Sequence, residues 1–263
     1  MKKNINLKNL FDLSGEVAVV TGGLGQLGSE FVKTLSAAGA KVVAFDIKPG
    51  EFQVDITKRK EVEAAFKKVV KKFGVPTILI NNAGIDAPPH SSSKDSGPFE
   101  DYPEESWDAV LDSHLKGMFL MSQEFLRVLG PSGKKGNIIN ISSTYGMVSP
   151  DQSLYDFRRK SGEEFYKPVA YSVAKSGVLN FTRWLAEYCR QRGLPVRVNT
   201  LVPGGVYAGQ DKEFVKEYSR RTILGRMAEK NEYNGAVLFL ASNKASSYMT
   251  GATLVVDGGW TAR

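Results

Sequence analysis

Cysteine is nearly absent from this chain of 263 residues, which contains only Cys189. A single cysteine cannot close an internal disulfide, so the class of secreted, disulfide-stabilised scaffolds is excluded and a reducing compartment is expected. Long apolar runs are also missing, because no stretch of 18 apolar residues could span a bilayer. The basic first residues lack the apolar run and cleavage site of a signal peptide. We therefore expect a cytoplasmic protein without a membrane partner, and we predict no metal site.

The charge is unbalanced, since 35 Lys and Arg against 28 Asp and Glu give a net charge of +7. Such a surplus indicates an anionic partner, which is nucleic acid, a membrane surface or a small molecule. The basic residues are scattered among acidic ones and form no long tail, so nucleic acid is not expected. Ordinary contents of hydrophobic residues (42%) and charged residues (24%) exclude a disordered or coiled-coil chain.

Short β-branched runs alternate with amphipathic stretches along the chain. The first run, EVAVVT, is typical of a strand buried on both faces, and the spacing of Leu27, Phe31 and Leu35 predicts a helix after it. Alternating strands and helices predict one α/β domain, a Rossmann fold with a doubly wound parallel sheet and helices on both faces. Predicted strands lie at 16–21, 41–46, 77–81, 136–142, 196–202 and 252–257, predicted helices at 26–38, 58–73, 103–129, 169–192 and 232–242, and predicted loops at 87–101 and 149–167.

Glycines follow the first predicted strand in the segment Thr21-Gly22-Gly23-Leu24-Gly25-Gln26-Leu27-Gly28. Such a turn lets the backbone approach a pyrophosphate at the N-terminus of the next helix. A tight turn that requires positive φ would explain the same glycines. The turn alone leaves both interpretations open.

Two acidic residues sharpen the interpretation of this turn. Asp46 ends the second predicted strand 46 − 28 = 18 residues after the last glycine, where an acid accepts the ribose hydroxyls of NAD and repels the 2′-phosphate of NADP. Lys48 close by keeps NADP open as the less favoured cofactor. Asp55 could reach the adenine amino group or cap the backbone beside Thr57, and a capping role is equally open for Asp46.

Tyr171 and Lys175 are four residues apart on a predicted helix, so both point from one face. A tyrosine has a reference pKa of about 10, and lowering it to near 7 requires about 4 kcal/mol of preferential phenolate stabilisation. The Lys175 ammonium and a positively charged nicotinamide ring would supply much of this, so that Tyr171 takes the proton of a substrate alcohol. Ser143 would donate a hydrogen bond to the same oxygen. An exposed amphipathic helix is the alternative for the Tyr171 and Lys175 pair.

These motifs resemble the classical short-chain dehydrogenases/reductases from about Leu10 to Trp260. Besides the glycine turn, the resemblance lies in Asn81-Asn82-Ala83-Gly84, Ile141-Ser142-Ser143, Tyr171-Ser172-Val173-Ala174-Lys175, Asn199 through Pro203-Gly204, and Asp257-Gly258-Gly259. It implies an enzyme that transfers hydride between NAD(P) and a CH–OH group, with Ser143, the second serine of its pair, as the catalytic serine, and a tetrameric or dimeric assembly. It implies cofactor contacts from Gly22, Gly25, Gln26, Leu27, Gly28, Asp46, Asp55, Ile56, Asn82, Ala83, Gly84, Tyr171, Lys175, Pro203, Gly204 and Val206.

The chain departs from the family pattern at three places. Gln26 stands where the family has its middle glycine, and it could bond a phosphate. His114 replaces a helix asparagine that holds a water near the catalytic lysine; we count it among the catalytic residues as a proton relay, with a structural imidazole bonded to backbone as the alternative. The distance from Ser143 to Tyr171 is 171 − 143 = 28 residues, which is longer than usual and indicates an insertion at 150–168.

The insertion begins after the predicted strand that precedes Ser143 and ends at the predicted helix that contains Tyr171. We therefore expect it to lie over the mouth of the substrate site, with the segment 205–228 as a second wall of that site. A lid for an anionic substrate is one interpretation, and a solvated loop or an oligomer contact is the other. The side chains considered for such a lid are Arg158, Arg159, Lys160, Tyr155, Phe157, Phe165 and Tyr166, with Tyr207, Arg220, Arg221 and Arg226 from the second segment.

The substrate class is predicted from short sequence blocks that resemble particular subgroups of the family and not from a catalytic motif. Blocks such as Leu224-Gly225-Arg226-Met227-Ala228 resemble bacterial members that make nonulosonic or other surface sugars. This favours a polar, sugar-like substrate, with anionic and nucleotide-linked sugars among the candidates. The opening Leu10-Phe11-Asp12-Leu13-Ser14-Gly15 resembles dehydrogenases of sugar acids such as gluconate. A different class stays open, a cofactor-binding protein with a regulatory or assembly role.

Overall fold

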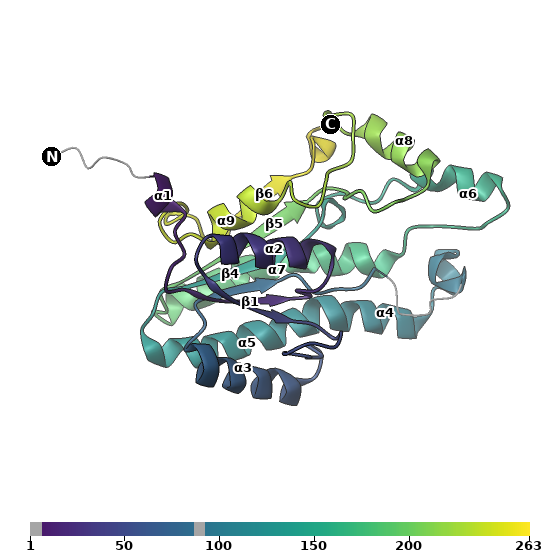
Figure 1. The fold of residues 1–263 in the computed structure, drawn as a ribbon. Helices are drawn as coiled ribbons and strands as arrows, with labels where there is room; N and C mark the ends of the chain where they lie inside the picture. Colours follow the sequence, from purple (N-terminus) through teal and green to yellow (C-terminus); the bar gives the residue numbers. More distant parts are fainter. Residues whose placement is uncertain (1–6, 87–92) are drawn as a thin grey trace.

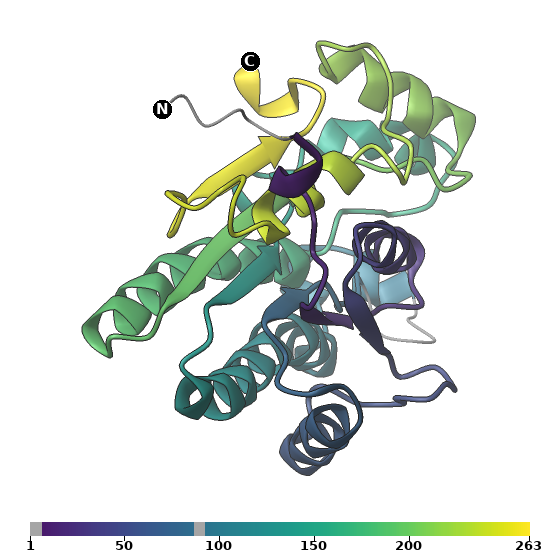
Figure 2. The same ribbon diagram turned by 60° about the vertical axis from the view of Figure 1, so that its left-hand side comes forward.

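Six parallel strands form one sheet in the computed structural model, which describes residues 7–86 and 93–263. The strands are β1 (Val17–Thr21), β2 (Lys41–Phe45), β3 (Ile78–Asn81), β4 (Gly136–Ile141), β5 (Val196–Pro203) and β6 (Thr253–Val256). They lie in the order β2-β1-β3-β4-β5-β6, and Figure 2 shows the yellow β6 at one edge beside the green β5. The predicted single-domain Rossmann fold is confirmed.

Helices cover both faces of the sheet (Figure 1). They are α1 (Leu7–Leu10), α2 (Gln26–Ala37), α3 (Arg59–Phe73), α4 (Glu104–Leu111), α5 (Gly117–Leu129), α6 (Asp156–Lys160), α7 (Val169–Gln191), α8 (Lys212–Arg221) and α9 (Asn234–Ala241). Residues of α3, α5 and α7 form one apolar cluster with the sheet, and residues of α2 and α9 form a second on its other face. Within the residues described, no helix has the length and apolar character needed to cross a bilayer.

Alternation along β1 explains why both faces are covered. Val17 and Val19 pack into the cluster that contains Phe66, whereas Ala18 and Val20 pack into the cluster that contains Phe31. Successive side chains of a strand point to opposite faces, so a fully apolar strand requires a layer on each side. Each buried phenylalanine contributes roughly 1.5–3 kcal/mol relative to exposure. Because all strand pairs are parallel, the carboxyl ends of the strands lie on the same side of the packed sheet.

The helix predicted over 103–129 is present from Glu104 to Leu129, but its hydrogen-bond pattern is not α-helical throughout. It is divided into α4 and α5 by a π-helical turn, Asp112–Lys116, which contains His114. The Ser113 hydroxyl donates to the carbonyl oxygen of Val110 at 2.9 Å and accepts from the backbone amide of Ile85 at 3.3 Å. Side-chain bonds of this kind compete with the regular helix pattern, and π turns often occur at functional sites.

The segments predicted as loops contain short helical elements. The segment 149–167 includes a 3-10 turn at Gln152–Tyr155 and helix α6. Helix α8 lies in the segment 205–228, which was expected to be a loop and helix region that forms the second wall of the substrate mouth. The loop predicted at 87–101 lies partly outside the described residues, and its described part contains 3-10 turns at Ser93–Ser96 and Phe99–Asp101.

Candidate active site

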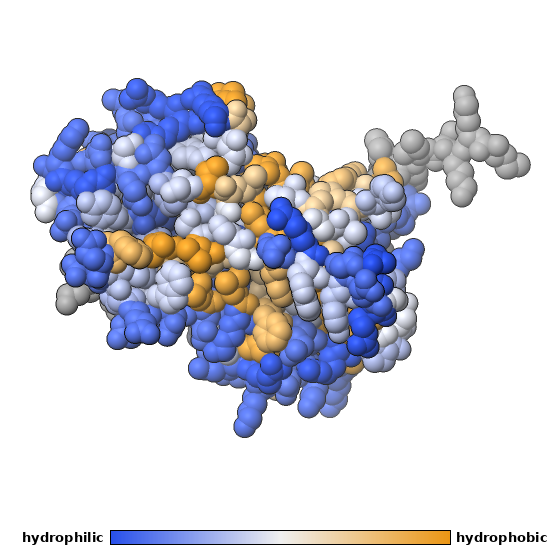
Figure 3. All heavy atoms as spheres, turned by 180° about the vertical axis from the view of Figure 1, so that it is seen from behind, coloured by the Kyte–Doolittle hydropathy of each residue, from blue (hydrophilic) through white to orange (hydrophobic). Residues whose placement is uncertain are grey.

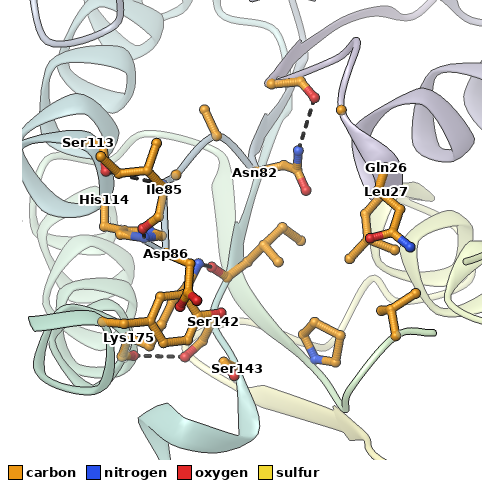
Figure 4. A pocket seen from close by; sticks show the side chains of 18 of the residues that line it. Gln26, Leu27, Asn82, Ile85, Asp86, Ser113, His114, Ser142, Ser143 and Lys175 are labelled. Atoms are coloured by element: carbon orange, nitrogen blue, oxygen red, sulfur yellow. Dashed lines mark hydrogen bonds between the residues drawn. The ribbon is translucent and has the colours of Figure 1, made fainter. Parts of the chain in front are cut away.

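A cavity of about 860 Å³ opens at the carboxyl edge of the sheet (Figure 4). It is lined by residues that follow β1, β2, β3, β4 and β5, because parallel strands deliver all their carboxyl ends to this edge. The chain leaves β1 toward β2 on one side and crosses to β3 on the other, which is the place where open α/β sheets bind ligands. Its volume falls in the range of roughly 300–1,000 Å³ common for cofactor pockets.

The glycine turn after β1 forms a backbone cradle at one end of this cavity. Gly22 has a φ of 62°, and the backbone amide of Gly25 donates to its carbonyl oxygen at 3.0 Å. A Cβ atom on Gly28 would lie 2.0 Å from that same oxygen, so only glycine fits there. Gly25 is the N-cap of α2, whose first backbone amides are open to an anion. The turn therefore fits a dinucleotide pyrophosphate, and its alternative role as a tight turn is compatible with this.

Gln26 does not stand free in this turn. Its side-chain amide donates to the carbonyl oxygen of Tyr207 at 3.1 Å, which joins the glycine turn to the segment 205–228. Gln26 and Leu27 both line the cavity (Figure 4). The residue that replaces the family's glycine thus connects two walls of the site.

The two acidic residues singled out from the sequence both line the cavity and both hold local backbone. Asp46, which is 8% exposed, accepts from the amide of Leu24 at 2.9 Å and from that of Lys48 at 3.0 Å. Asp55 accepts from the amide and hydroxyl of Thr57 at 2.9 and 2.7 Å, as the capping alternative predicts. Because Asp46 is fixed by two amides, its carboxylate has a defined orientation at the cavity wall.

Asn82 ties β3 to the glycine turn. Its side-chain amide donates to the carbonyl oxygen of Thr21 at 3.0 Å, while the amides of Asn82 and Ala83 donate to the Thr21 hydroxyl at 3.0 Å. All the residues expected to contact a cofactor line the cavity, with one exception. Gly28 does not line it and packs against Gly22. Those lining residues are Gly22, Gly25, Gln26, Leu27, Asp46, Asp55, Ile56, Asn82, Ala83, Gly84, Tyr171, Lys175, Pro203, Gly204 and Val206.

Ser143, Tyr171 and Lys175 meet at the other part of the cavity. The ammonium of Lys175 donates to the carbonyl oxygen of Ile141 at 2.9 Å and lies 5.6 Å from the centre of the Tyr171 ring. The Ser143 hydroxyl accepts from the backbone amide of Tyr145 at 3.2 Å. Ser142 has the backbone role expected for it, since its hydroxyl donates to the carbonyl oxygen of Lys175 at 2.7 Å (Figure 4).

Burial dominates the electrostatics of Tyr171 and Lys175. Burial raises the pKa of Tyr171 to about 12, and hydrogen bonding to Ser143 only partly opposes this. Burial also lowers the pKa of Lys175 to about 7, against the influence of the Asp86 carboxylate. Both groups lose hydration in the same buried place, so the protein alone favours a protonated Tyr171 and a Lys175 that is only partly charged near neutral pH. The expected lowering of the Tyr171 pKa includes the charge of a bound nicotinamide and stays a prediction.

His114 is held by the backbone, as the structural alternative predicted. Its Nε2 lies 2.8 Å from the carbonyl oxygen of Ile85, and the ring meets Tyr171 edge-on at 5.4 Å. Burial and the charge of Lys175 lower the pKa of His114 to about 3, so the ring is neutral at physiological pH. Nε2 must then carry the hydrogen, and Nδ1 has no hydrogen-bond partner in the described part of the chain. A relay through charged His114 does not agree with this environment.

The insertion at 150–168 contributes Tyr155 and Lys167 to the cavity, and Phe165 packs on Tyr155 with ring centres 4.7 Å apart. The basic residues expected to face the substrate lie elsewhere, because none of them lines the cavity. Their arginines form ion pairs instead: Arg158 with Glu163 and Asp211, Arg159 with Asp156, Arg220 with Glu217, Arg221 with Asp151 and Glu217, and Arg226 with Glu232. Lys160 is exposed. The expectation that these basic side chains form a lid over an anionic substrate is therefore wrong.

The sequence did not point to several cavity residues. The segment 205–228 supplies Gln210, Phe214, Tyr218 and Met227. Asp86, which follows the motif after β3, lines the cavity and forms an ion pair with Lys167. A signal was present for Asp86, since a charged residue near the end of a buried strand lies at the carboxyl edge. Among the residues described, no group of three or more His, Cys, Asp or Glu side chains is arranged to hold a metal.

The chain is similar in sequence to known oxidoreductases. Residues 25–261 match the family model described as Enoyl-(Acyl carrier protein) reductase. An NADH-dependent L-xylulose reductase of Ambrosiozyma monospora is 31% identical, over 96% of this chain and 97% of that protein.

Solved structures extend the similarity to the whole fold. A short-chain dehydrogenase of Leptospira borgpetersenii with bound NAD+ has a TM-score of 0.85 and 34% identity, covering 99% of this chain and 98% of that one. A gluconate 5-dehydrogenase of Burkholderia cenocepacia, in complex with NADP and tartrate, has a TM-score of 0.81 and 25% identity, covering 98% of this chain and 100% of that one.

Proposed function

The chain belongs to the classical short-chain dehydrogenases/reductases, a family of oxidoreductases that act on CH–OH groups, and on this premise we propose that it transfers hydride between NAD and a polar, sugar-like alcohol or ketone. The observation that carries the proposal is one continuous cavity. The glycine cradle and Asp46 line one part of it, and Ser143, Tyr171 and Lys175 line another.

The proposed chemistry assigns a role to each buried group. Ser143 donates a hydrogen bond to the substrate oxygen, and Tyr171 removes the proton from an alcohol or returns it to a ketone. A bound nicotinamide supplies the hydride acceptor or donor and, in its oxidised form, a positive charge. Moving the pKa of Tyr171 from about 12 to near 7 requires roughly 7 kcal/mol of phenolate stabilisation, more than Ser143 alone provides. The charged form of Lys175 adds to the stabilisation of the Tyr171 phenolate.

Asp46 supports NAD as the cofactor. Its oriented carboxylate would accept hydrogen bonds from ribose hydroxyls and repel a 2′-phosphate. NADP is the alternative, because Lys48 also lines the cavity and the Burkholderia relative was solved with NADP. The NADH-dependent xylulose reductase and the NAD+-bound Leptospira structure favour the first choice.

A sugar-like substrate is supported by the relatives that act on xylulose and gluconate. A sugar-acid dehydrogenase is the nearest alternative. The narrower prediction of a surface-sugar enzyme with a nucleotide-linked substrate has no counterpart among the relatives named above. A regulatory cofactor-binding protein would not need Ser143, Tyr171 and Lys175 together, and we place it last.

We propose a homo-oligomer in the cytoplasm. Large apolar side chains are exposed on the helices that cover one face of the sheet: Phe119 on α5, and Val173, Trp184 and Tyr188 on α7. Trp184 and Tyr188 stack with ring centres 5.3 Å apart. Figure 3 shows apolar residues gathered in a band across the side of the molecule opposite to that in Figure 1. Such a band suits a contact between copies of the chain.

The test is a panel of polyols, sugar acids, nucleotide sugars and simple secondary alcohols, each assayed with NAD and NADP by absorbance of the reduced nicotinamide. Calorimetry measures binding of both cofactors to the purified chain. The proposal predicts NAD binding and NAD-dependent oxidation within the sugar-like group. Binding of neither cofactor, together with no turnover across the panel, would refute it.

A further inference from the structure

Asp86 and Lys167 form an ion pair at the wall of the cavity, beside Tyr171. The ammonium of Lys167 contacts both carboxylate oxygens of Asp86 and lies 5.0 Å from the centre of the Tyr171 ring. Figure 4 shows Asp86 on the same side of the cavity as Ser143 and Lys175. The pair thus borders the place where the substrate would react.

The two partners are not equally open to the cavity. The side chain of Lys167 is 12% exposed, whereas that of Asp86 is 57% exposed. Lys167 is also anchored through its backbone, because its amide donates to Gln152 Oε1 at 2.8 Å and its carbonyl oxygen accepts from Gln152 Nε2 at 3.3 Å. Both residues line the cavity, and Asp86 presents the more exposed side chain, with the ammonium of Lys167 held beside it.

A carboxylate at this position opposes the ionisation of Tyr171. Its negative charge raises the pKa of Tyr171. The Lys167 ammonium, 5.0 Å from the centre of the Tyr171 ring, has the opposite sign, and an opposite charge at that distance favours the phenolate. The fold thus retains an acid that hinders the phenolate and compensates for it. Asp86 also raises the pKa of Lys175 and so favours its charged form, which means that the same carboxylate has opposite effects on the two catalytic groups.

The other charges of the cavity limit what such a substrate can be. The cationic side chains among its described lining residues are Lys48, Lys167 and Lys175, and no arginine lines it. Arginine is the side chain best suited to bidentate recognition of carboxylates and phosphates. The Asp86 carboxylate, although paired with Lys167, is 57% exposed and has lone pairs left to accept hydrogen bonds from hydroxyl groups, and the pair as a whole adds no net positive charge that would attract an anion.

We propose that Asp86, oriented by Lys167, binds hydroxyl groups next to the reacting carbon and so selects a neutral polyol or its ketose over a sugar acid or sugar phosphate. This inference rests on the proposed function and narrows its substrate class. Asp86 is the specificity-determining residue. Lys167 is a positioning residue that also shields Tyr171 from the acid.

The experiment compares the wild type with Asp86→Asn and Lys167→Met, using xylitol and D-arabinitol as neutral substrates and gluconate as the anionic one. We expect the wild type to prefer the pentitols. Asp86→Asn should lower kcat/KM for the pentitols by roughly 10- to 100-fold, the loss typical of a charged hydrogen bond, and should lower the pentitol-to-gluconate ratio. NAD affinity, measured by calorimetry, should stay within about twofold of the wild type because Asp86 is outside the cofactor cradle.

The pH dependence of alcohol oxidation by the Lys167→Met variant is a second, separate readout. The substitution leaves the Asp86 charge uncompensated, so the pH at half-maximal alcohol oxidation should rise, whereas Asp86→Asn should lower it. Glu187→Gln is the matched control, because it removes an exposed carboxylate that pairs with Arg190 on α7 away from the cavity, and it should change neither readout. Should Asp86→Asn fail to bind NAD, Asp86→Ser takes its place.

Two results would overturn the inference while leaving the proposed function intact. One is a wild type that prefers gluconate, and the other is an Asp86→Asn variant whose pentitol-to-gluconate ratio is unchanged. Absence of NAD-dependent turnover with every substrate would instead refute the proposed function, and the inference with it.

Discussion

Replacing Lys175 with methionine should stabilise the fold at neutral pH while it abolishes turnover. The Lys175 side chain is 4% exposed, and burial lowers its pKa from 10.5 to about 7. The folded protein therefore binds fewer protons than the unfolded chain between pH 7 and 10.5, and wild-type stability from this group rises with pH across that window. Below it, the full penalty of burying the lysine is present. Methionine has a similar length and no charge to bury.

The free-energy cost of burying Lys175 follows from the difference between the pH and the pKa of the lysine in the unfolded chain. At pH 8 the native lysine destabilises the fold by roughly 3 kcal/mol, and at pH 9.5 by roughly 1 kcal/mol, at about 1.4 kcal/mol per pKa unit. The variant loses the hydrogen bond from Lys175 to Ile141, which contributes about 1 kcal/mol. The net gain is therefore about 2 kcal/mol at pH 8 and near zero at pH 9.5.

Urea denaturation at pH 8 and 9.5 measures this difference, provided that refolding is reversible. Lys33→Met is the matched control, because the Lys33 side chain is 68% exposed and its replacement should give the same small change at both pH values. Equal stability of wild type and Lys175→Met at pH 8, or a gain that grows toward pH 9.5, would refute the reasoning.

Three further predictions concern the cofactor site and the histidine. Gly28→Ala should weaken NAD binding at least about 100-fold in calorimetry, since its Cβ would lie 2.0 Å from the carbonyl oxygen of Gly22, whereas Gly235→Ala, with open space around it, should bind normally. Asp46→Ala should weaken NAD binding about 10-fold or more and reduce discrimination against NADP; an unchanged NAD-to-NADP affinity ratio would contradict this. His114→Asn should leave the pH–rate profile unaltered between pH 5 and 8, since the pKa of His114 is about 3; loss of a limb near pH 6.5 would contradict it.

Sequence reasoning located the sheet because its signals are local. An apolar run such as Val17–Thr21 followed by glycines defines a buried strand and its turn without knowledge of distant partners. The motifs around Tyr171 and the glycine turn were likewise recognised from short spacings. Those segments now lie on the same cavity, where the sequence-based interpretation expected them.

Features that depend on distant contacts were not predicted. The apolar periodicity of 103–129 continues through the π-helical turn, where the Ser113 hydroxyl accepts a hydrogen bond from the distant backbone amide of Ile85. The pairing of Asp86 with Lys167 joins residues far apart in the chain. The arginines of the insertion illustrate the same limit, because composition predicts their charge but not whether they face substrate or pair with neighbouring acids.

The central claim, that Tyr171 moves the substrate proton in an NAD-dependent reaction, is tested most directly with Tyr171→Phe. The measurement pairs NADH formation from the best polyol with calorimetric NAD affinity, and Tyr248→Phe, which removes the hydroxyl of a fully exposed tyrosine, is the control. The account predicts a loss of kcat of about 100- to 10,000-fold, with NAD affinity within about twofold of the wild type. Turnover by Tyr171→Phe at the rate of the Tyr248→Phe control would contradict it.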